Sequence, residues 1–382
     1  MAIVSVAFCF DDKFCTLAAG AIASLIHHVK ANHQYDIYII HYDISEQNKN
    51  LICGINNKLN VSIKFIYFDA QITLQNKLYL RAWYSRDIYS RLFLHKILPD
   101  IKRILYLDAD IIVTCDIANI FNTELNGYPL AAVASQPHFV SEELKIDTWK
   151  SDEAISKAKG FEMYKNKYDY LSRHLGLLPT EITRYFASFL LLMDLKRVGD
   201  VIDAGVSTLL KDHQFALPDQ DILNILFKNK TLLLPESYGI SQNNVYIYEK
   251  KNGKWPEIIH YDGGINRKPD KNMARYGDLF YWNSISKTEF FYPILEKYIS
   301  YKLEMLRSGN NKNHIKDELA LKVLDHNDSI IIKKRRIRQR YIRLIINIVV
   351  NRRKYKKLKI NPAQFFLDSK NKVIRTLGRY YF

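Results

Sequence analysis

Two aspartates near the middle of the chain have the spacing of a divalent metal site. Asp108 and Asp110 directly follow the apolar, β-prone run Arg103–Leu107. In an extended chain, residues i and i+2 project from one face about 6–7 Å apart. Both carboxylates can then reach one ion, with metal–oxygen bonds of about 2.0–2.2 Å. A solvated Asp-Ala-Asp turn at a strand end is the alternative, and the pair alone does not decide between the two.

Four separate patches of the sequence, the aspartate pair aside, carry groups suited to a nucleotide diphosphate. A divalent ion can bridge phosphate oxygens, Arg and Lys can neutralise the remaining charge, and glycines allow close backbone approach. Each patch also has an ordinary explanation as a turn acid, an exposed helix face, a helix N-cap or a strand-end histidine. The patches are Asp11-Asp12, Arg91, Asp219 to Asn224, and His260 to Asp270.

The elements that must position these residues alternate between strand and helix patterns. The alternation predicts an α/β fold with a doubly wound, mostly parallel sheet and flanking helices. In such sheets ligands bind beyond the carboxyl ends of strands, where Asp11, Asp108 and Asp110 fall. The expected strands are Ala2–Phe10, Tyr35–Tyr42, Val61–Phe68, Arg103–Leu107, Leu130–Ser135, Phe189–Met193, Lys230–Leu234 and Glu257–Tyr261. The expected helices are Thr16–Val29, Ser45–Leu59, Ser85–Leu98, Asp200–Leu210, Pro218–Lys228 and Phe290–Leu306.

The net charge of +16 over 382 residues is concentrated at the C-terminal end. Residues 333–382 contain 17 Lys and Arg and one acid, Asp368, whereas the first 332 residues are formally neutral. With the apolar run Leu344–Val350 and several aromatic residues, this segment predicts a helical, basic extension that binds an anionic membrane surface. RNA binding is the competing interpretation, but the remainder of the chain has no RNA-binding motif, so nucleic acid is not the expected partner.

Further features favour a cytoplasmic protein on the inner face of the membrane. The four cysteines form no CxxC pair, which favours reduced thiols. The N-terminus has no basic segment of a signal peptide, and no stretch reaches about 18 uninterrupted apolar residues. We therefore expect peripheral attachment without a membrane span.

In this order, the patches resemble glycosyltransferase family 8, the retaining, nucleotide-sugar-dependent group that includes glycogenin and bacterial lipopolysaccharide galactosyl- and glucosyltransferases. The resemblance covers Val4–Asp278, and its most specific parts are Leu-Tyr-Leu-Asp-Ala-Asp at 105–110 and Asp-Gln-Asp-Ile-Leu-Asn at 219–224. It implies a GT-A type nucleotide-sugar domain over residues 1–285. A helical segment at 286–332 and the basic aromatic extension at 333–382 would follow.

The resemblance also implies roles for individual residues. Asp108, Asp110 and His260 would hold Mn²⁺, or Mg²⁺, and Asp219 and Gln220 would line the donor sugar as the catalytic pair. Gln220 would lie opposite the leaving diphosphate. The remaining donor contacts would be Asp11 at the uridine, and Arg91, Gly263 and Lys268 around the diphosphate.

The sequence departs from the family pattern at two places. The family motif Tyr-Phe-Asn-Ala-Gly reads Tyr-Phe-Ala-Ser-Phe here, so Ala187 replaces an asparagine that contacts the donor sugar and Phe189 replaces a glycine. The segment after His260 is stretched and ends in Asp270 instead of tryptophan, so Arg267 could share the role of Lys268.

The expected function is transfer of a hexose from UDP-glucose or UDP-galactose, with retention, to a lipopolysaccharide, lipooligosaccharide or related glycan acceptor. Two alternatives remain at this stage. One is a phosphatase of the Asp-x-Asp nucleophile type, although Ile112 stands where those enzymes usually have Thr or Val. The other is a non-catalytic nucleotide-sugar binder, which Ala187 and Phe189 motivate. The sequence does not identify the sugar, the acceptor or the linkage.

Overall fold

The computed structural model describes residues 2–70, 86–135, 150, 152, 155–157, 159–212, 214–262 and 275–298. They belong to one compact unit that spans Met1–Glu304. The predicted extension at 333–382, most of the predicted segment 286–332, and the predicted donor contacts Gly263 and Lys268 lie outside the described residues.

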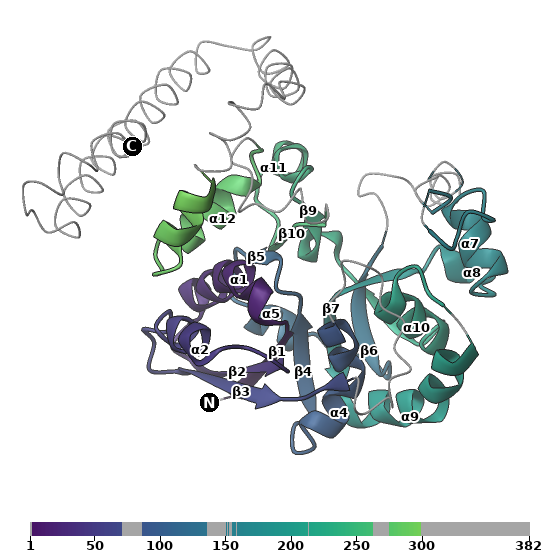
Figure 1. Cartoon of the computed structure of the whole chain (residues 1–382), viewed down its shortest axis with the longest axis horizontal. Coiled ribbons are helices and arrows are strands. Elements are labelled where there is room, and N and C mark those ends of the chain that lie inside the picture. The colour runs from purple at the N-terminus through teal and green to yellow at the C-terminus, as the bar shows by residue number, and fades with distance from the viewer. Residues whose placement is uncertain are drawn as a thin grey trace, which may run out of the picture. The chain divides into compact units, whose positions relative to one another are not determined.

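A seven-stranded sheet in the order β3-β2-β1-β4-β7-β6-β8 forms the centre of this unit (Figure 1). All neighbouring pairs are parallel except those of β7, which runs antiparallel to both β4 and β6. The sheet is therefore mixed: four of its six neighbouring pairs are parallel, in line with the predicted mostly parallel sheet, and β7 is the antiparallel strand. The strands are β1 (Ala2–Cys9), β2 (His33–His41), β3 (Val61–Tyr67), β4 (Arg103–Leu107), β6 (Leu130–Ala134), β7 (Phe186–Asp194) and β8 (Thr231–Leu234).

The central strands of this sheet are buried on both faces. Their successive side chains point to opposite faces, and each face packs into its own core cluster. Leu105 and Leu107 of β4 belong to one core cluster, and Ile104 and Tyr106 belong to the other. The first core also contains residues of α1 (Cys15–His28) and α12 (Asp278–Ile285), and the second contains residues of α9 (Leu195–Asp212) and α10 (Pro218–Leu226). Helices on both faces explain why the central strands are continuously apolar.

A second, three-stranded sheet in the order β5-β10-β9 lies beside the end of β4. It consists of β5 (Ile111–Val113), β9 (Ile240–Ser241) and β10 (Ile258–His260), with β10 antiparallel to β5 and parallel to β9. The chain passes from the large sheet to the small one between β4 and β5, through only three residues, 108–110.

The remaining elements are short and depart in places from the sequence-based boundaries. The helix expected at Ser85–Leu98 is a 3₁₀ segment, η2, followed by one turn of α-helix, α4, and β7 starts at Phe186, before the expected Phe189. Residues 291–298 are helical, within the predicted helix Phe290–Leu306. The elements not yet given are η1 (Asp12–Phe14), α2 (Glu46–Cys53), η2 (Arg86–Phe93), α4 (Leu94–Ile97), α5 (Ala118–Phe121), α7 (Lys167–Arg173), α8 (Pro179–Ile182), η4 (Glu236–Tyr238) and α11 (Val245–Asn252).

Candidate active site

Asp108 and Asp110 occupy the bend between the two sheets, so their backbone is fixed from both sides. The backbone N–H of Asp108 donates to the carbonyl of Phe189 on β7 at 2.8 Å. The carbonyl of Asp110 accepts from the backbone N–H of Tyr261 at 2.9 Å, directly after β10. The spacing that predicted a shared ligand is thus held by hydrogen bonds to two different strands.

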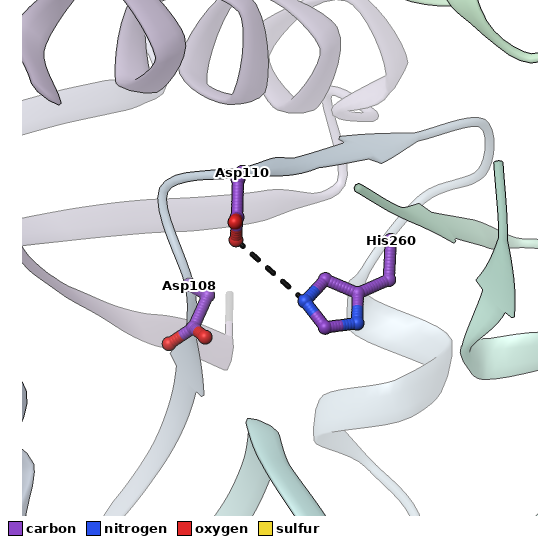
Figure 2. A group of neighbouring side chains, drawn as sticks. All are labelled: Asp108, Asp110 and His260. Carbon is purple, nitrogen blue, oxygen red and sulfur yellow. Dashed lines mark ion pairs between the residues drawn. The ribbon is translucent and has the colours of Figure 1, made fainter. Parts of the chain in front are cut away.

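The imidazole of His260 faces the two carboxylates from β10 (Figure 2). His260 is opposite Ile111 in the β5–β10 ladder, which brings it beside residues 108–110 despite a separation of about 150 positions in the sequence. Ligand atoms of Asp108, Asp110 and His260 lie within 4.8 Å of one another, and Nε2 of His260 is 3.7 Å from Oδ1 of Asp110. The structure therefore brings the three predicted metal ligands together.

This donor set fits a divalent ion. With bonds of about 2.0–2.2 Å, two ligands of one ion lie at most about 4.4 Å apart, so small side-chain rotations suffice. Burial lowers the pKa of His260, and the neutral imidazole is the form that binds a metal. Two carboxylate oxygens and one imidazole nitrogen suit Mn²⁺ better than a site built of oxygens alone. Two acids this close also require a cation.

Part of that positive charge comes from Arg91, which lies on η2 and is only 4% exposed. Its guanidinium is 3.0 Å from Oδ1 of Asp108 and 2.9 Å from Oδ2 of Asp219, and it lies 4.5 Å from the ring centroid of Tyr106. It also donates to Ser188, at 2.9 Å to the carbonyl and 3.1 Å to Oγ. Although burial opposes its charge, Asp108 and Asp219 raise the pKa of Arg91. Arg91 is therefore a buried cation between two carboxylates, not a residue on an exposed helix face.

The carboxylate of Asp108 is oriented by this arrangement. Its Oδ1 accepts from the hydroxyl of Tyr106 at 2.6 Å and pairs with Arg91. Both interactions involve the same oxygen, so the carboxylate plane is set from one side. The side chain of Asp108 keeps 23% exposure, and that of Asp110 keeps 16%. Partial exposure leaves both carboxylates accessible to a ligand.

Helix α10 presents Asp219 and Gln220 at its first turn. Pro218 stands at the first helical position, where its missing N–H costs nothing. Asp219 is 6% exposed and pairs with Arg91. The side chain of Gln220 accepts from the backbone N–H of Ser188 at 3.2 Å and donates to the hydroxyl of Tyr185 at 3.1 Å. Gln220 is therefore held in one orientation beside β7, with part of its surface exposed.

The same helix anchors itself to the scaffold through Asp221 and Asn224. Asp221 accepts from the hydroxyls of Tyr170 and Tyr185 and from the N–H of Leu217, and burial raises its pKa even though these bonds favour the ionised form. Asn224 bonds both backbone groups of Phe186, each at 2.9 Å. The motif at 219–224 thus fixes α10 against the start of β7.

Phe189 occupies the position where the family motif has glycine, and its ring stacks on the imidazole of His260. The ring centroids are 4.2 Å apart, with an angle of 20° between the planes. Ala187, at the position of the family asparagine, is partly buried and has no side chain that could hydrogen-bond a sugar. Both substitutions in this motif therefore lie on β7, the strand beside Asp108.

One further residue predicted to contact the donor, Asp11, lies in the described part of the chain. Asp11, at the end of β1, caps η1 by accepting from the N–H of Phe14 at 3.2 Å, and its predicted contact with uridine stays a prediction. Sequence reasoning missed Tyr106 and Ser188, which hold Asp108 and Arg91. Tyr106 lies within the motif at 105–110, whereas no sequence signal marked Ser188.

The sequence matches a known protein family and several known proteins. Residues 5–273 match the family described as Glycosyl transferase family 8. The lipopolysaccharide 1,2-glucosyltransferase of Escherichia coli (strain K12) is 29% identical over 218 residues, which cover 53% of this chain and 54% of that protein.

Two solved structures have similar folds. The bifunctional glycosyltransferase WbbM gives a TM-score of 0.64 at 22% identity, over 78% of this chain and 52% of its own. The galactosyltransferase LgtC, solved with donor and acceptor sugar analogs, gives 0.55 at 18% identity, over 75% and 96%. The chain thus spans about half the length of the E. coli glucosyltransferase and of WbbM.

Proposed function

The chain belongs to glycosyltransferase family 8, a retaining family with the GT-A fold, and on that premise we propose that it transfers a hexose from a UDP-sugar to a lipopolysaccharide or related glycan acceptor. The observation that carries this proposal is the convergence of Asp108 and Asp110, in the bend between the two sheets, with His260 of β10. The lipopolysaccharide 1,2-glucosyltransferase relative supports that class of acceptor. The family match argues against the phosphatase alternative.

Three residues would hold the metal, Mn²⁺ in this proposal: Asp108, Asp110 and His260. When bound, the ion stabilises the charge of the departing diphosphate. The orientation of Asp108 by Tyr106 and Arg91 prepares this side of the site before the donor arrives.

The carboxylates of α10 are unsuited to form a covalent intermediate. Asp219 is buried against Arg91, and Asp221 is fully buried and accepts from two tyrosine hydroxyls. Gln220 has an amide in place of a carboxylate. A double displacement needs a free carboxylate next to the sugar, and neither carboxylate of α10 is free for that role.

Retention then follows from reaction on one face of the sugar. The bond between C1 and the diphosphate oxygen breaks, the acceptor oxygen bonds to C1 on the same face, and the acceptor proton passes to the departing diphosphate. Gln220, fixed by Ser188 and Tyr185, would face the sugar from the opposite side and stabilise the positive charge that develops at C1.

The test is incubation of the full chain with Mn²⁺ and UDP-glucose, UDP-galactose or UDP-N-acetylglucosamine, with UDP release and the anomer of the released sugar as readouts. Slow hydrolysis of one donor with retained configuration supports the proposal. Binding of a donor without UDP release under any condition would favour a non-catalytic binder. Cleavage of simple phosphate esters would contradict the proposal.

We also propose, from the charge of residues 333–382 alone, that the C-terminal extension attaches the enzyme to the inner face of the cytoplasmic membrane. Every helix in the described part of the chain is too short or too polar to cross a lipid bilayer. Attraction of basic residues to anionic lipid is about 1 kcal/mol per residue near the surface, so 17 of them support surface attachment. The arrangement would keep the enzyme beside lipid-linked acceptors.

A further inference from the structure

We propose that Phe189 is a positioning residue for the metal site: its ring holds the imidazole of His260 in the orientation that faces Asp108 and Asp110. The inference rests on the proposed metal site and adds to it a residue in which this chain differs from the family motif. It concerns the protein before any donor binds, so metal affinity can test it without turnover.

The backbone places Phe189 directly beside the metal carboxylates. Its carbonyl accepts the N–H of Asp108 at 2.8 Å, and its neighbour Leu190 is opposite Leu107 in the β4–β7 ladder. The side chain is 4% exposed. Phe189 is therefore fixed within a central strand of the large sheet, and its ring contacts His260 of the small sheet.

The stack on Phe189 restrains the orientation of the His260 imidazole. The β5–β10 ladder fixes the backbone of His260 but leaves the side-chain torsions open. A metal-binding histidine usually donates its second ring N–H to a carboxylate or carbonyl, which sets the ring orientation. Between His260 and the other described residues, no such hydrogen bond is present, whereas Phe189 lies parallel to the imidazole at 4.2 Å between centroids. The stack can take the place of that hydrogen bond.

Gly239 provides the room that this large side chain needs. A Cβ built at Gly239 would collide with Cζ of Phe189 and would lie 3.3 Å from Cγ1 of Val133. The backbone of Gly239 has φ of −169°, outside the left-handed region that favours glycine, so the close approach of the ring is the feature that calls for a glycine here. Phe189 and Gly239 thus form a complementary pair, with the bulk on β7 and the space after η4.

The first experiment titrates Mn²⁺ alone into the full-length protein and measures free Mn²⁺ by electron paramagnetic resonance. Phe189→Leu keeps an apolar side chain but removes the ring face, and an aromatic stack of this kind corresponds to about a 3- to 10-fold change in affinity. Phe121→Leu is the matched control, because Phe121 is 8% exposed on α5 and its ring lies beside Arg103, at the opposite end of β4. We expect both variants to lose stability in urea and only Phe189→Leu to bind Mn²⁺ more weakly.

A second variant moves the ring without removing it. Gly239→Ala forces Phe189 off its position, so we expect it to weaken Mn²⁺ binding in the wild-type background and to add little in the Phe189→Leu background. Unchanged Mn²⁺ affinity in Phe189→Leu, or equal weakening in Phe121→Leu, overturns the positioning role. Asp110→Asn separates the two proposals: if wild type and Asp110→Asn bind Mn²⁺ alike, the metal site itself is wrong and the inference falls with it.

Discussion

Replacing Arg91 by methionine should destabilise the protein strongly, because it leaves a buried carboxylate without a partner. The Asp219 side chain is 8% exposed and the Arg91 side chain 5%. Breaking a buried ion pair by removing one partner costs about 3–5 kcal/mol. Asp108, the other partner, keeps 23% side-chain exposure and can bind water instead, so we assign most of the loss to Asp219.

The loss of stability in Arg91→Met should increase as the pH rises. Burial raises the pKa of Asp219 above its ordinary 3.8, and Arg91 lowers it. A group whose pKa is higher in the folded state contributes stability that is complete below its unfolded pKa and is lost as the pH rises through its folded pKa. Without Arg91 the folded pKa moves further up, so Arg91→Met should lose more stability at pH 8 than at pH 5.

Urea unfolding monitored by circular dichroism, with chelator present, measures both effects. The double variant Arg91→Met/Asp219→Asn should recover about 2 kcal/mol and show little of the added pH dependence, because the unpaired charge is gone. The matched control is Arg173→Met, which breaks an ion pair with Asp169 on α7 in which the arginine side chain is 61% exposed; it should cost at most about 0.5 kcal/mol. A loss below about 1 kcal/mol in Arg91→Met, without rescue by Asp219→Asn, would refute the reasoning.

Three further predictions concern the metal carboxylates, the anchor of α10 and the basic C-terminal extension. Asp108→Asn or Asp110→Asn should each lower turnover at least about 100-fold and weaken Mn²⁺ binding, whereas the exposed acid in Asp100→Asn should leave both unchanged; full activity in excess chelator would contradict the metal site. Asn224→Leu removes the partners of two Phe186 backbone groups and should cost about 2–4 kcal/mol in urea unfolding. A chain ending at Ser329 should sediment less with anionic vesicles than the full chain, and salt should weaken the full chain's binding as the Debye length falls from about 10 Å at 0.1 M to 3 Å at 1 M; equal sedimentation of the two chains would exclude the extension as the anchor.

The sequence predicted the α/β class and the residues of the metal site because both depend on local patterns. Apolar runs identified most strands, and the spacing of Asp108 and Asp110 is a property of any extended segment. The direction of β7 has no such local signature, because the same apolar pattern fits a parallel or an antiparallel neighbour. The prediction of a mostly parallel sheet therefore holds for the other strands but did not identify β7, which brings Ser188 and Phe189 to the site, as the antiparallel one.

The partners of the site residues depend on tertiary packing. Arg91 in the sequence is one basic residue in an amphipathic stretch, and only the approach of η2 to the end of β4 and to α10 shows that it pairs with Asp108 and Asp219. Likewise, the sequence shows only that Phe189 departs from the family motif. The structure shows that its ring occupies space left by Gly239, fifty residues later. A substitution and the space that accommodates it can be recognised as a pair only in three dimensions.

The motif at 219–224 combines two roles within two turns of one helix. Asp219 and Gln220 contact residues of the site, whereas Asp221 and Asn224 hold α10 against Tyr170, Tyr185 and β7. Because Tyr185 bonds both Gln220 and Asp221, loss of an anchor would also release the amide at the site. A variant at 221 or 224 could therefore lose turnover without any contact with the donor. Stability separates the cases: Gln220→Ala removes a partly exposed amide that bonds one backbone N–H and should cost less unfolding free energy than Asn224→Leu, which removes the partner of two backbone groups. If Gln220 acts at the site, its variant should nevertheless lose at least as much turnover.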